Sequence, residues 1–288
     1  MISIEKLCGK NIDNFKSLVA EANRYVGYRL DFFASHDDKS FLSKHILRKN
    51  VNLIIHNGTY IGYAWIRISS NKVIYIQDIF IKKEYLGYIS EGFPLLFRGN
   101  TFIYESLEND YFKALASALG MYKIRESYLM SLDTRYPLEN IKYNLQYRHL
   151  ILNKDEELRC LLQNSIFKDN SRVPLTPSDV RFDEKQEYYL KDLCIFLLCE
   201  NKAIGYGQIV FNRGIYSIVN FGILEKYRGK GYGKEFMHRL IILAKEHNIE
   251  ELNIRVDALN EIAKKLYYSV GFEEKGIFST WIYNKNKV

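Results

Sequence analysis

The chain has 288 residues, of which 47% are hydrophobic and 26% charged, so it can bury a core in one large domain or two small ones. The formal net charge is +7, but Lys and Arg are interspersed with acids and never form a block of five, which argues against a nucleic-acid groove. No apolar run approaches the ~20 residues of a membrane-spanning helix, and the first residues lack the pattern of a signal peptide. We therefore expect a cytoplasmic monomer or homodimer with neither membrane nor nucleic acid as a partner.

The four cysteines indicate neither a disulfide framework nor a metal centre. They are scattered without a CxxC spacing, and none stands beside a histidine at ligand spacing. We expect ordinary buried thiols and no metal site. These residues are Cys8, Cys160, Cys194 and Cys199.

The first half of the chain predicts a small α/β unit. A hairpin turn is expected within 57–64, a strand at 76–85 and a helical segment at 109–121. The stretch 134–142 is polar and contains Pro137, so we place the domain boundary there. The predicted domains are residues 1–136 and residues 140–288.

The second half predicts a similar unit with longer elements. Residues 168–185 form a loop and a short helix, and a strand is expected at 193–198. A helix at 234–247 lies between strands at 215–223 and 251–257, which is a βαβ arrangement with two parallel strands. A second helix follows at 260–269.

The two halves resemble each other at fixed spacings. Residues 201–207 repeat the turn at 57–64, with Gly205 over Gly62, and 218–227 repeats 76–85 at an offset of 142 (218 − 76). Residues 260–272 repeat 109–121 at an offset of 151 (260 − 109). The first half has therefore lost about nine residues between these blocks, and the chain is interpreted as two copies of one unit.

A glycine-rich turn is the strongest local signal. Residues 227–234, Tyr-Arg-Gly-Lys-Gly-Tyr-Gly-Lys, directly follow a predicted strand and precede a predicted helix. Alternate glycines expose backbone N–H groups, which together with the positive end of a helix form an anion site. The R-x-x-G-x-G spacing is neither the dinucleotide fingerprint nor a P-loop.

Residues 260–272 predict a short helix with Asn260 as its N-cap and Gly271 in a left-handed conformation at its end. Ala263, Leu266, Tyr267 and Val270 share one face. On propensity alone Tyr267 is a core aromatic residue.

Together, the turn at 227–234 and the string N-x-x-A-x-x-L-Y-x-x-x-G-F at 260–272 resemble the GNAT acetyltransferase superfamily. The motifs cover about 221–272, and the family's fold accounts for about 142–288. The resemblance implies two tandem GNAT-like domains of α/β class, each a mostly antiparallel twisted sheet with a central parallel strand pair flanked by helices. It also implies acetyl-CoA as the acyl donor and a primary amine, small-molecule or peptide, as the acceptor.

The resemblance assigns roles to residues of this chain. Tyr267 matches the family's usual proton donor to the departing thiolate, and a backbone N–H within 221–223 stabilises the thioester oxygen. Asn260 doubles as helix cap and cofactor contact. The residues implied to bind the cofactor are Phe221, Gly222, Ile223, Arg228, Gly229, Lys230, Gly231, Tyr232, Gly233, Lys234, Asn260 and Ala263.

The general base is not assigned. Asp257 and Glu225 are candidates, but each is better described as a solvated surface carboxylate. His238 is more typical of a surface or packing histidine than of a catalyst, and a water chain can serve instead. The implied function is N-acetyl transfer by direct attack. Alternatives are a non-catalytic acyl-CoA-binding sensor or scaffold, and an aminoacyl transferase that uses tRNA, which the intact turn argues against.

The first half fails the same test. Residues 86–91, Leu-Gly-Tyr-Ile-Ser-Glu, stand where the second half has its glycine-rich turn, and Ala116 takes the place of Tyr267 (267 − 151). We therefore expect a degenerate unit with a structural role. Its aromatic residues could line an acceptor pocket or form a core: Tyr25, Tyr28, Phe32 and Phe33.

Overall fold

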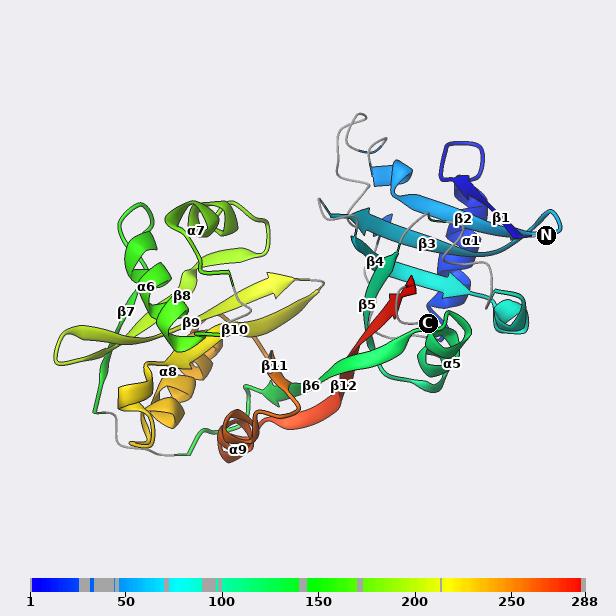
Figure 1. The fold of residues 1–288 in the computed structure, drawn as a ribbon. Coiled ribbons are helices and arrows are strands. Elements are labelled where there is room, and N and C mark those ends of the chain that lie inside the picture. Colours follow the sequence, from blue (N-terminus) through cyan, green and yellow to red (C-terminus); the bar gives the residue numbers. More distant parts are fainter. Residues whose placement is uncertain are drawn as a thin grey trace. The chain divides into compact units, whose positions relative to one another are not determined.

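The computed structural model describes residues 2–25, 32–33, 44, 47–69, 73–89, 97, 100–139, 144–169, 173–212 and 214–285. The chain divides into two compact units, Met1–Ser127 with Gly276–Val288, and Tyr128–Lys275. Each unit is a mixed sheet with one parallel strand pair and flanking helices (Figure 1), so the predicted fold class is confirmed.

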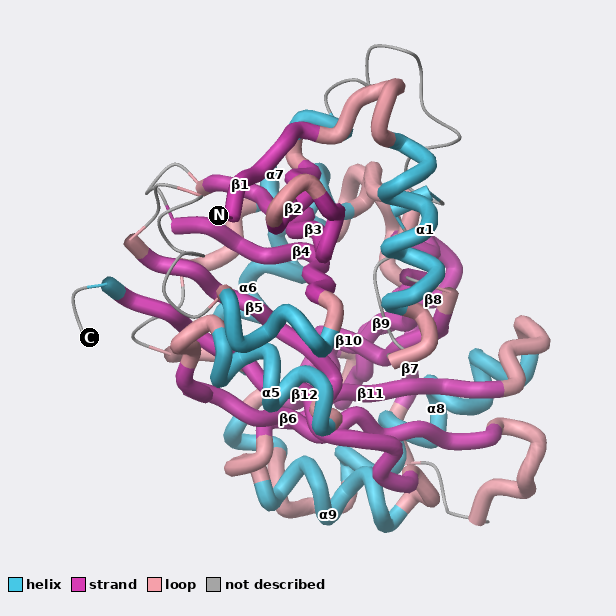
Figure 2. The backbone as a smooth tube through the Cα atoms, turned by 90° about the vertical axis from the view of Figure 1, so that its right-hand side faces the viewer, coloured by secondary structure: helices cyan, strands magenta, loops and turns pink. Residues whose placement is uncertain are grey.

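The first unit follows the sheet order β1-β2-β3-β4-β5-β12 and continues into the start of β6. Its neighbours pair antiparallel except for β4 and β5, which are parallel. Helix α1 lies along β3 and β4 (Figure 2) and buries Phe15 and Leu18 there. The elements are β1 (Ile2–Lys6), α1 (Ile12–Ala22), β2 (Val51–His56), β3 (Thr59–Ile68), β4 (Val73–Ile81), the 3-10 helix η1 (Lys83–Tyr88), β5 (Thr101–Leu107), α5 (Asp110–Ala118), β6 (Tyr122–Asp133) and β12 (Glu273–Asn284).

The second unit has the sheet order β6-β11-β10-β9-β8-β7, with β10 and β11 parallel. Side chains of β8 alternate between two buried layers: Ile195 packs among residues of α8, whereas Phe196 packs among residues of α6. Both faces of this sheet are therefore covered. The elements are β7 (Gln146–His149), α6 (Glu156–Ile166), α7 (Pro177–Asp183), β8 (Tyr189–Cys199), β9 (Lys202–Asn212), β10 (Ile215–Ile223), the 3-10 helix η2 (Glu225–Tyr227), α8 (Tyr232–Glu246), β11 (Glu251–Asp257) and α9 (Glu261–Ser269).

The internal repeat is visible in the elements themselves. β10 starts 142 residues after β4 (215 − 73), η2 starts 142 after η1 (225 − 83) and α9 starts 151 after α5 (261 − 110). Asn109 and Asn260 cap the two matched helices in the same way, by accepting from the backbone N–H three residues on. The predicted strands at 215–223 and 251–257 coincide with β10 and β11.

The compact units differ from the predicted domain ranges 1–136 and 140–288 in two strands. β12 begins in the second unit, but its residues Phe278–Asn284 pair with β5 of the first. Conversely, β6 begins in the first unit and its last residues lie beside β11 of the second. The polar stretch that suggested the boundary follows β6 and is partly outside the described residues (140–143).

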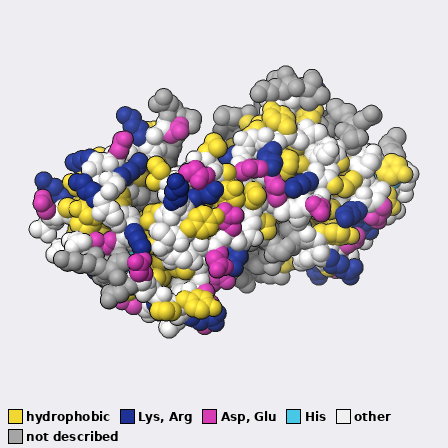
Figure 3. All heavy atoms as spheres, turned by 90° about the horizontal axis from the view of Figure 1, so that it is seen from below, with side chains coloured by type: hydrophobic (Ala, Val, Ile, Leu, Met, Phe, Trp, Pro, Cys, Tyr) yellow, Lys and Arg dark blue, Asp and Glu magenta, His cyan; other side chains and the backbone are white. Residues whose placement is uncertain are grey.

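Surface features agree with an interspersed charge pattern. On the face that Figure 3 shows, basic and acidic side chains are mixed and no large area carries one sign. No helix among the described ranges is long and apolar enough to cross a membrane.

Cys8, which we expected to be buried, is exposed, because it lies in the turn after β1 where its N–H donates to Asn11 Oδ1 at 2.8 Å.

Candidate functional site

The turn between η2 and α8 requires glycine at two positions. Gly229 and Gly231 have φ of +76° and +79°, a region that residues with a Cβ avoid. Among the described residues, the backbone N–H groups of 229–233 donate to no backbone carbonyl, whereas those of Lys234 and Glu235 both donate to Gly231 O, at 3.1 and 3.2 Å. The turn therefore leaves a group of N–H donors at the positive end of the 15-residue helix α8, which suits an anion such as a diphosphate.

The basic side chains of this turn have different roles. Arg228 donates from Nε to Ile223 O at 3.0 Å and from Nη2 to Ile166 O at 3.2 Å, so it fastens the turn to the ends of β10 and α6. Lys234 forms an ion pair with Glu139, which lowers the pKa of that carboxyl. Lys230 lies over the ring of Tyr227. The sequence correctly indicated a basic turn, but Arg228 holds backbone as well as adding charge.

The parallel strands of the second unit separate just before this turn. β10 and β11 pair only at Ser217–Asn253 and Ile218–Ile254. A bulge follows between Val219 and Gly222, with Asn220 at φ +54°, and it removes Phe221 from the regular ladder with β9. Beyond Ile218 the two strands have no further pairs among the described residues. The backbone of Asn220 and Phe221 therefore lies outside the ladder beside the gap, next to the segment to which the resemblance assigns the stabilising N–H.

Helix α9 brings the second motif to the same region. A Cβ on Gly233 would lie 3.2 Å from Leu266, so the first turn of α8 packs closely on α9. Asn260 Oδ1 accepts from Ala263 N at 3.1 Å and starts the helix. The two motifs, separated in sequence, thus meet at one end of the second sheet.

Tyr267 lies on the buried face of α9. Its side chain is 6% exposed and its ring centroid is 6.2 Å from that of Phe221, the strand residue at the bulge. Its hydroxyl has no hydrogen-bond partner within the part of the chain that the structure describes, and burial raises the pKa of Tyr267 to about 12. The phenol is therefore protonated at neutral pH and can donate. Its neighbour Tyr268 is half exposed and donates to Glu274 instead.

The structure locates the three candidate bases, but its geometry does not single out one of them as the base. Asp257 Oδ1 accepts from Leu259 N at 3.0 Å and shapes the turn after β11, and Glu225 begins η2. His238, expected at the surface or in packing, is fully buried on α8, and burial lowers its pKa. The base remains unassigned.

The corresponding place in the first unit is filled by a tyrosine that the sequence comparison missed. Tyr111 of α5 donates from its hydroxyl to Ile81 O at 2.8 Å and accepts from Ile81 N at 2.9 Å, at the end of β4. Its ring lies 5.8 Å from that of Phe80, the counterpart of Gly222, and 5.3 Å from that of Tyr25. The signal was present in the sequence as aromatic side chains at positions where the second half has Gly222 and the exposed Ile262.

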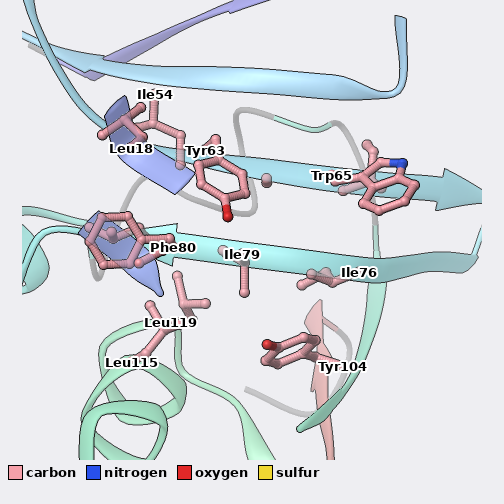
Figure 4. Close-up of a cluster of buried hydrophobic side chains, with 14 of the residues drawn as sticks. Leu18, Ile54, Tyr63, Trp65, Ile76, Ile79, Phe80, Tyr104, Leu115 and Leu119 are labelled. Atoms are coloured by element: carbon pink, nitrogen blue, oxygen red, sulfur yellow. The ribbon is translucent and has the colours of Figure 1, made fainter. Parts of the chain in front are cut away.

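Other aromatic residues of the first unit form its core. Phe32 contacts Phe15 and Trp65, with ring centroids 5.1 and 5.3 Å away, and Phe33 packs beside it. Tyr63 and Phe80 point into the same apolar layer (Figure 4). The core interpretation therefore holds for Phe32 and Phe33, whereas Tyr25 is 38% exposed. Tyr28, Ser90 and Glu91 lie outside the described residues.

Comparisons with known proteins agree with this geometry. Residues 162–272 match the family model described as the acetyltransferase (GNAT) family. A stretch of 60 residues is 42% identical to an uncharacterized N-acetyltransferase, YycN, of Bacillus subtilis (strain 168), and covers 21% of this chain and 38% of that relative. The aligned part is thus well under half of the curated relative it matches.

Solved structures match the whole chain in fold. A GCN5-related N-acetyltransferase from Sphaerobacter thermophilus gives a TM-score of 0.70 at 13% identity, over 99% of this chain and 96% of its own. A tandem GNAT protein from the clavulanic acid biosynthesis pathway gives 0.66 at 10% identity, over 99% of each chain. The predicted fold of two tandem GNAT-like units is confirmed, and the family model matches in the second half.

Proposed function

Because residues 162–272 belong to the GNAT acetyltransferase family, we propose that the protein transfers an acyl group, acetyl in the first instance, from coenzyme A to a primary amine. One observation carries this proposal: the turn with free N–H groups at the start of α8 stands beside two parallel strands that have just separated. Such a pair of features suits a ligand with a diphosphate at one end and a thin chain at the other.

The cofactor would be held by two groups of residues. The N–H groups of the turn at 229–233 and the charge of Lys230 face the diphosphate, and Arg228 keeps that turn in place. The backbone of Phe221, Gly222 and Ile223 would line the gap between the strands. Asn260 and Ala263, at the start of α9, would add further contacts to the cofactor. Cβ atoms on Gly229 and Gly231 would meet no atom within 4 Å, so the space over the turn is open.

Acyl-CoA supplies a thioester whose acyl carbon accepts an amine. The attacking amine must be neutral, although a free alkyl ammonium has a pKa near ~10. A backbone N–H released by the bulge at Asn220 and Phe221 stabilises negative charge on the acyl oxygen. Attack by the neutral amine would form the carbon–nitrogen bond and break the carbon–sulfur bond. Tyr267 would donate a proton to the departing sulfur, and the amine nitrogen would lose a proton to water, which balances the transfer.

Thermal unfolding with and without excess acetyl-CoA tests the donor site, because a ligand that binds only the folded state raises the midpoint. We expect a clear rise, followed by release of free thiol when amines are added. A rise without thiol release from any amine would favour the acyl-CoA-binding scaffold, in which Tyr267 only packs. No rise with acetyl-CoA or with longer acyl-CoAs would remove the proposal.

A further inference from the structure

The second unit holds a polar pocket that the cofactor site does not use. It has a volume of about 250 Å³, lies between α6, α7 and the bulge of β10, and is lined by Arg159, Gln163 and Asn220 among others. Arg159 and Gln163 are four residues apart and so share one face of α6. The end of that helix reaches β10, because Ile166 fills the space where Gly222 has no side chain. The pocket therefore lies beside the separated strands.

Two buried side chains of this pocket lack hydrogen-bond partners among the described residues. Gln163 has no exposed surface, and neither its Oε1 nor its Nε2 is bonded. Arg159 is 2% exposed, and its Nε and Nη1 are likewise without acceptors. Nearly all buried polar groups in folded proteins are hydrogen-bonded, so four such atoms in one pocket indicate a missing partner.

The guanidinium of Arg159 is fixed by its surroundings. Its Nη2 donates to Asp183 Oδ2 at 2.5 Å, and the other oxygen of that carboxylate accepts from the Tyr188 hydroxyl at 2.5 Å. The guanidinium carbon lies 5.2 Å from the ring centroid of Tyr206, which supports it from the sheet. A positive charge that is held in place in this way, with two nitrogens unused, favours an anionic oxygen acceptor.

The charge balance of the pocket narrows the ligand further. Asp179 and Asp183 also line it, so with Arg159 the local sum is one negative charge. A phosphate with close to two charges would be repelled by the two carboxylates. A molecule with both a carboxylate and an ammonium matches both signs of charge in the pocket. Its carboxylate can accept from Arg159 and the Gln163 nitrogen, and its ammonium is attracted by the remaining negative charge and can donate to Gln163 Oε1.

We propose that this pocket binds the acceptor, and that the acceptor is a small amine carrying a carboxylate, as an α-amino acid does. The inference rests on the proposed acyl transfer and specifies its substrate class. The amine nitrogen bonds to the acyl carbon, the carbon–sulfur bond breaks, and the proton lost from nitrogen balances the proton gained by sulfur. The products are an N-acylated carboxylic acid and free coenzyme A.

Gln163→Leu is the most informative variant, because leucine is similar in size and removes two unpaired buried atoms, so the fold should be kept. Leu161→Gln, at an exposed position of the same helix, is the matched control. Free-thiol release from acetyl-CoA is measured with L-amino acids, each compared with its amide, and with O-phosphoethanolamine. We expect the acids to exceed the amides at least tenfold in kcat/KM. In Gln163→Leu the KM of the acids should rise at least tenfold, while that of acetyl-CoA stays unchanged.

Three results would overturn the inference: equal use of acids and amides, a preference for O-phosphoethanolamine, or an unchanged KM in Gln163→Leu. Binding is measured separately by thermal unfolding with the same amino acids in the presence of coenzyme A. If no thiol is released but amino acids raise the midpoint of the wild type and not of Gln163→Leu, the pocket assignment stands and the transfer reaction falls. If no amino acid raises the wild-type midpoint, the pocket holds water only and the inference fails, whatever acetyl-CoA does.

Discussion

The ends of β4 and β10 are the same place in two copies of one unit, and they differ in what fills them. In the first unit, Tyr111 satisfies both the N–H and the carbonyl of Ile81 and packs against Phe80. In the second, Gly222 and Ile223 occupy the matched positions, and no aromatic side chain of α9 bonds to their backbone. In one copy a tyrosine of the helix occupies the end of the strand. In the other, Arg228 of the turn bonds to the Ile223 carbonyl, and the bulge leaves the backbone of Asn220 and Phe221 outside the ladder.

The connections that follow these two strand ends also differ between the units. In the second unit 23 residues (228–250) separate η2 from β11, and they include the glycine turn and helix α8. In the first unit 12 residues (89–100) separate η1 from β5. A 15-residue helix does not fit in the shorter connection. Loss of the anion site and closure of the gap therefore agree, because a gap without a ligand is only a destabilising cavity.

Of the substitutions that compare the two units, Gly231→Val should have the largest effect, and the effect is on acetyl-CoA affinity. The residue has φ +79°, so a β-branched side chain strains or rearranges the turn and misaligns its N–H donors. We expect acetyl-CoA affinity to fall at least about 100-fold, which corresponds to about 2.7 kcal/mol. Isothermal titration with acetyl-CoA measures it.

Gly87→Val is the control, at a position of η1 in the first unit where a Cβ would meet no atom. It should leave acetyl-CoA affinity unchanged. Unaltered affinity in Gly231→Val would place the diphosphate elsewhere.

Tyr267→Phe should lower kcat by about 100-fold and leave acetyl-CoA binding intact, because it removes a proton donor but keeps the packed ring. Burial raises the pKa of Tyr267 to about 12, so the hydroxyl stays protonated as pH rises from about 7 to about 10, and its ionisation should not lower kcat in that range. The stability that comes from keeping this phenol neutral is present below its unfolded pKa near ~10 and is lost as pH rises through about 12.

Steady-state kinetics of the wild type and of Tyr267→Phe at several pH values make the measurement. Tyr268→Phe, on the exposed side of the same helix, is the control and should retain full activity. Full activity of Tyr267→Phe would assign that residue to packing alone.

Tyr111→Phe tests the closed gap of the first unit. It keeps the ring and removes two buried hydrogen bonds, which leaves the N–H and carbonyl of Ile81 unpaired and should cost about 1–3 kcal/mol of unfolding free energy. Urea unfolding measures the loss, with Tyr122→Phe at a partly exposed position as the control. An unchanged free energy of unfolding would mean that these bonds do not hold the gap closed.

The matched helix caps should give the smallest and most symmetrical effect. Asn109→Ala and Asn260→Ala each remove the side-chain bond to the third backbone N–H of a helix and should each cost about 1 kcal/mol for the lost cap. Asn109→Ala also removes a bond from Asn109 Nδ2 to Tyr25 O at 3.1 Å and should therefore cost slightly more. Only Asn260→Ala should also weaken acetyl-CoA binding, as measured by titration. Equal cofactor affinity in both variants would restrict Asn260 to capping.

Much of this comparison could be predicted from the sequence because turns and caps are local. Asn260, Gly271 and the positive-φ glycines of the turn appear in the structure where the motif indicated them. The tyrosine at the end of β4 was missed, since its partner Ile81 is 30 residues away in the sequence and Tyr111 matches none of the residues that carry the two motifs of the second half. Pairing of β12 with β5 was missed for a related reason: a strand's own sequence does not name the strand it joins.

Strands β6 and β12 each contribute residues to both units, and this arrangement affects folding during synthesis on the ribosome. The sheet of the first unit lacks its partner for β5 until residues up to Asn284 have left the ribosome, although most of that unit is synthesised before residue 128. During translation of the intervening residues, β5 has an unpaired edge that other strands can join. The nascent chain therefore depends on late synthesis to protect an early domain, and any pause in translating the second half prolongs the time in which the first can misassemble.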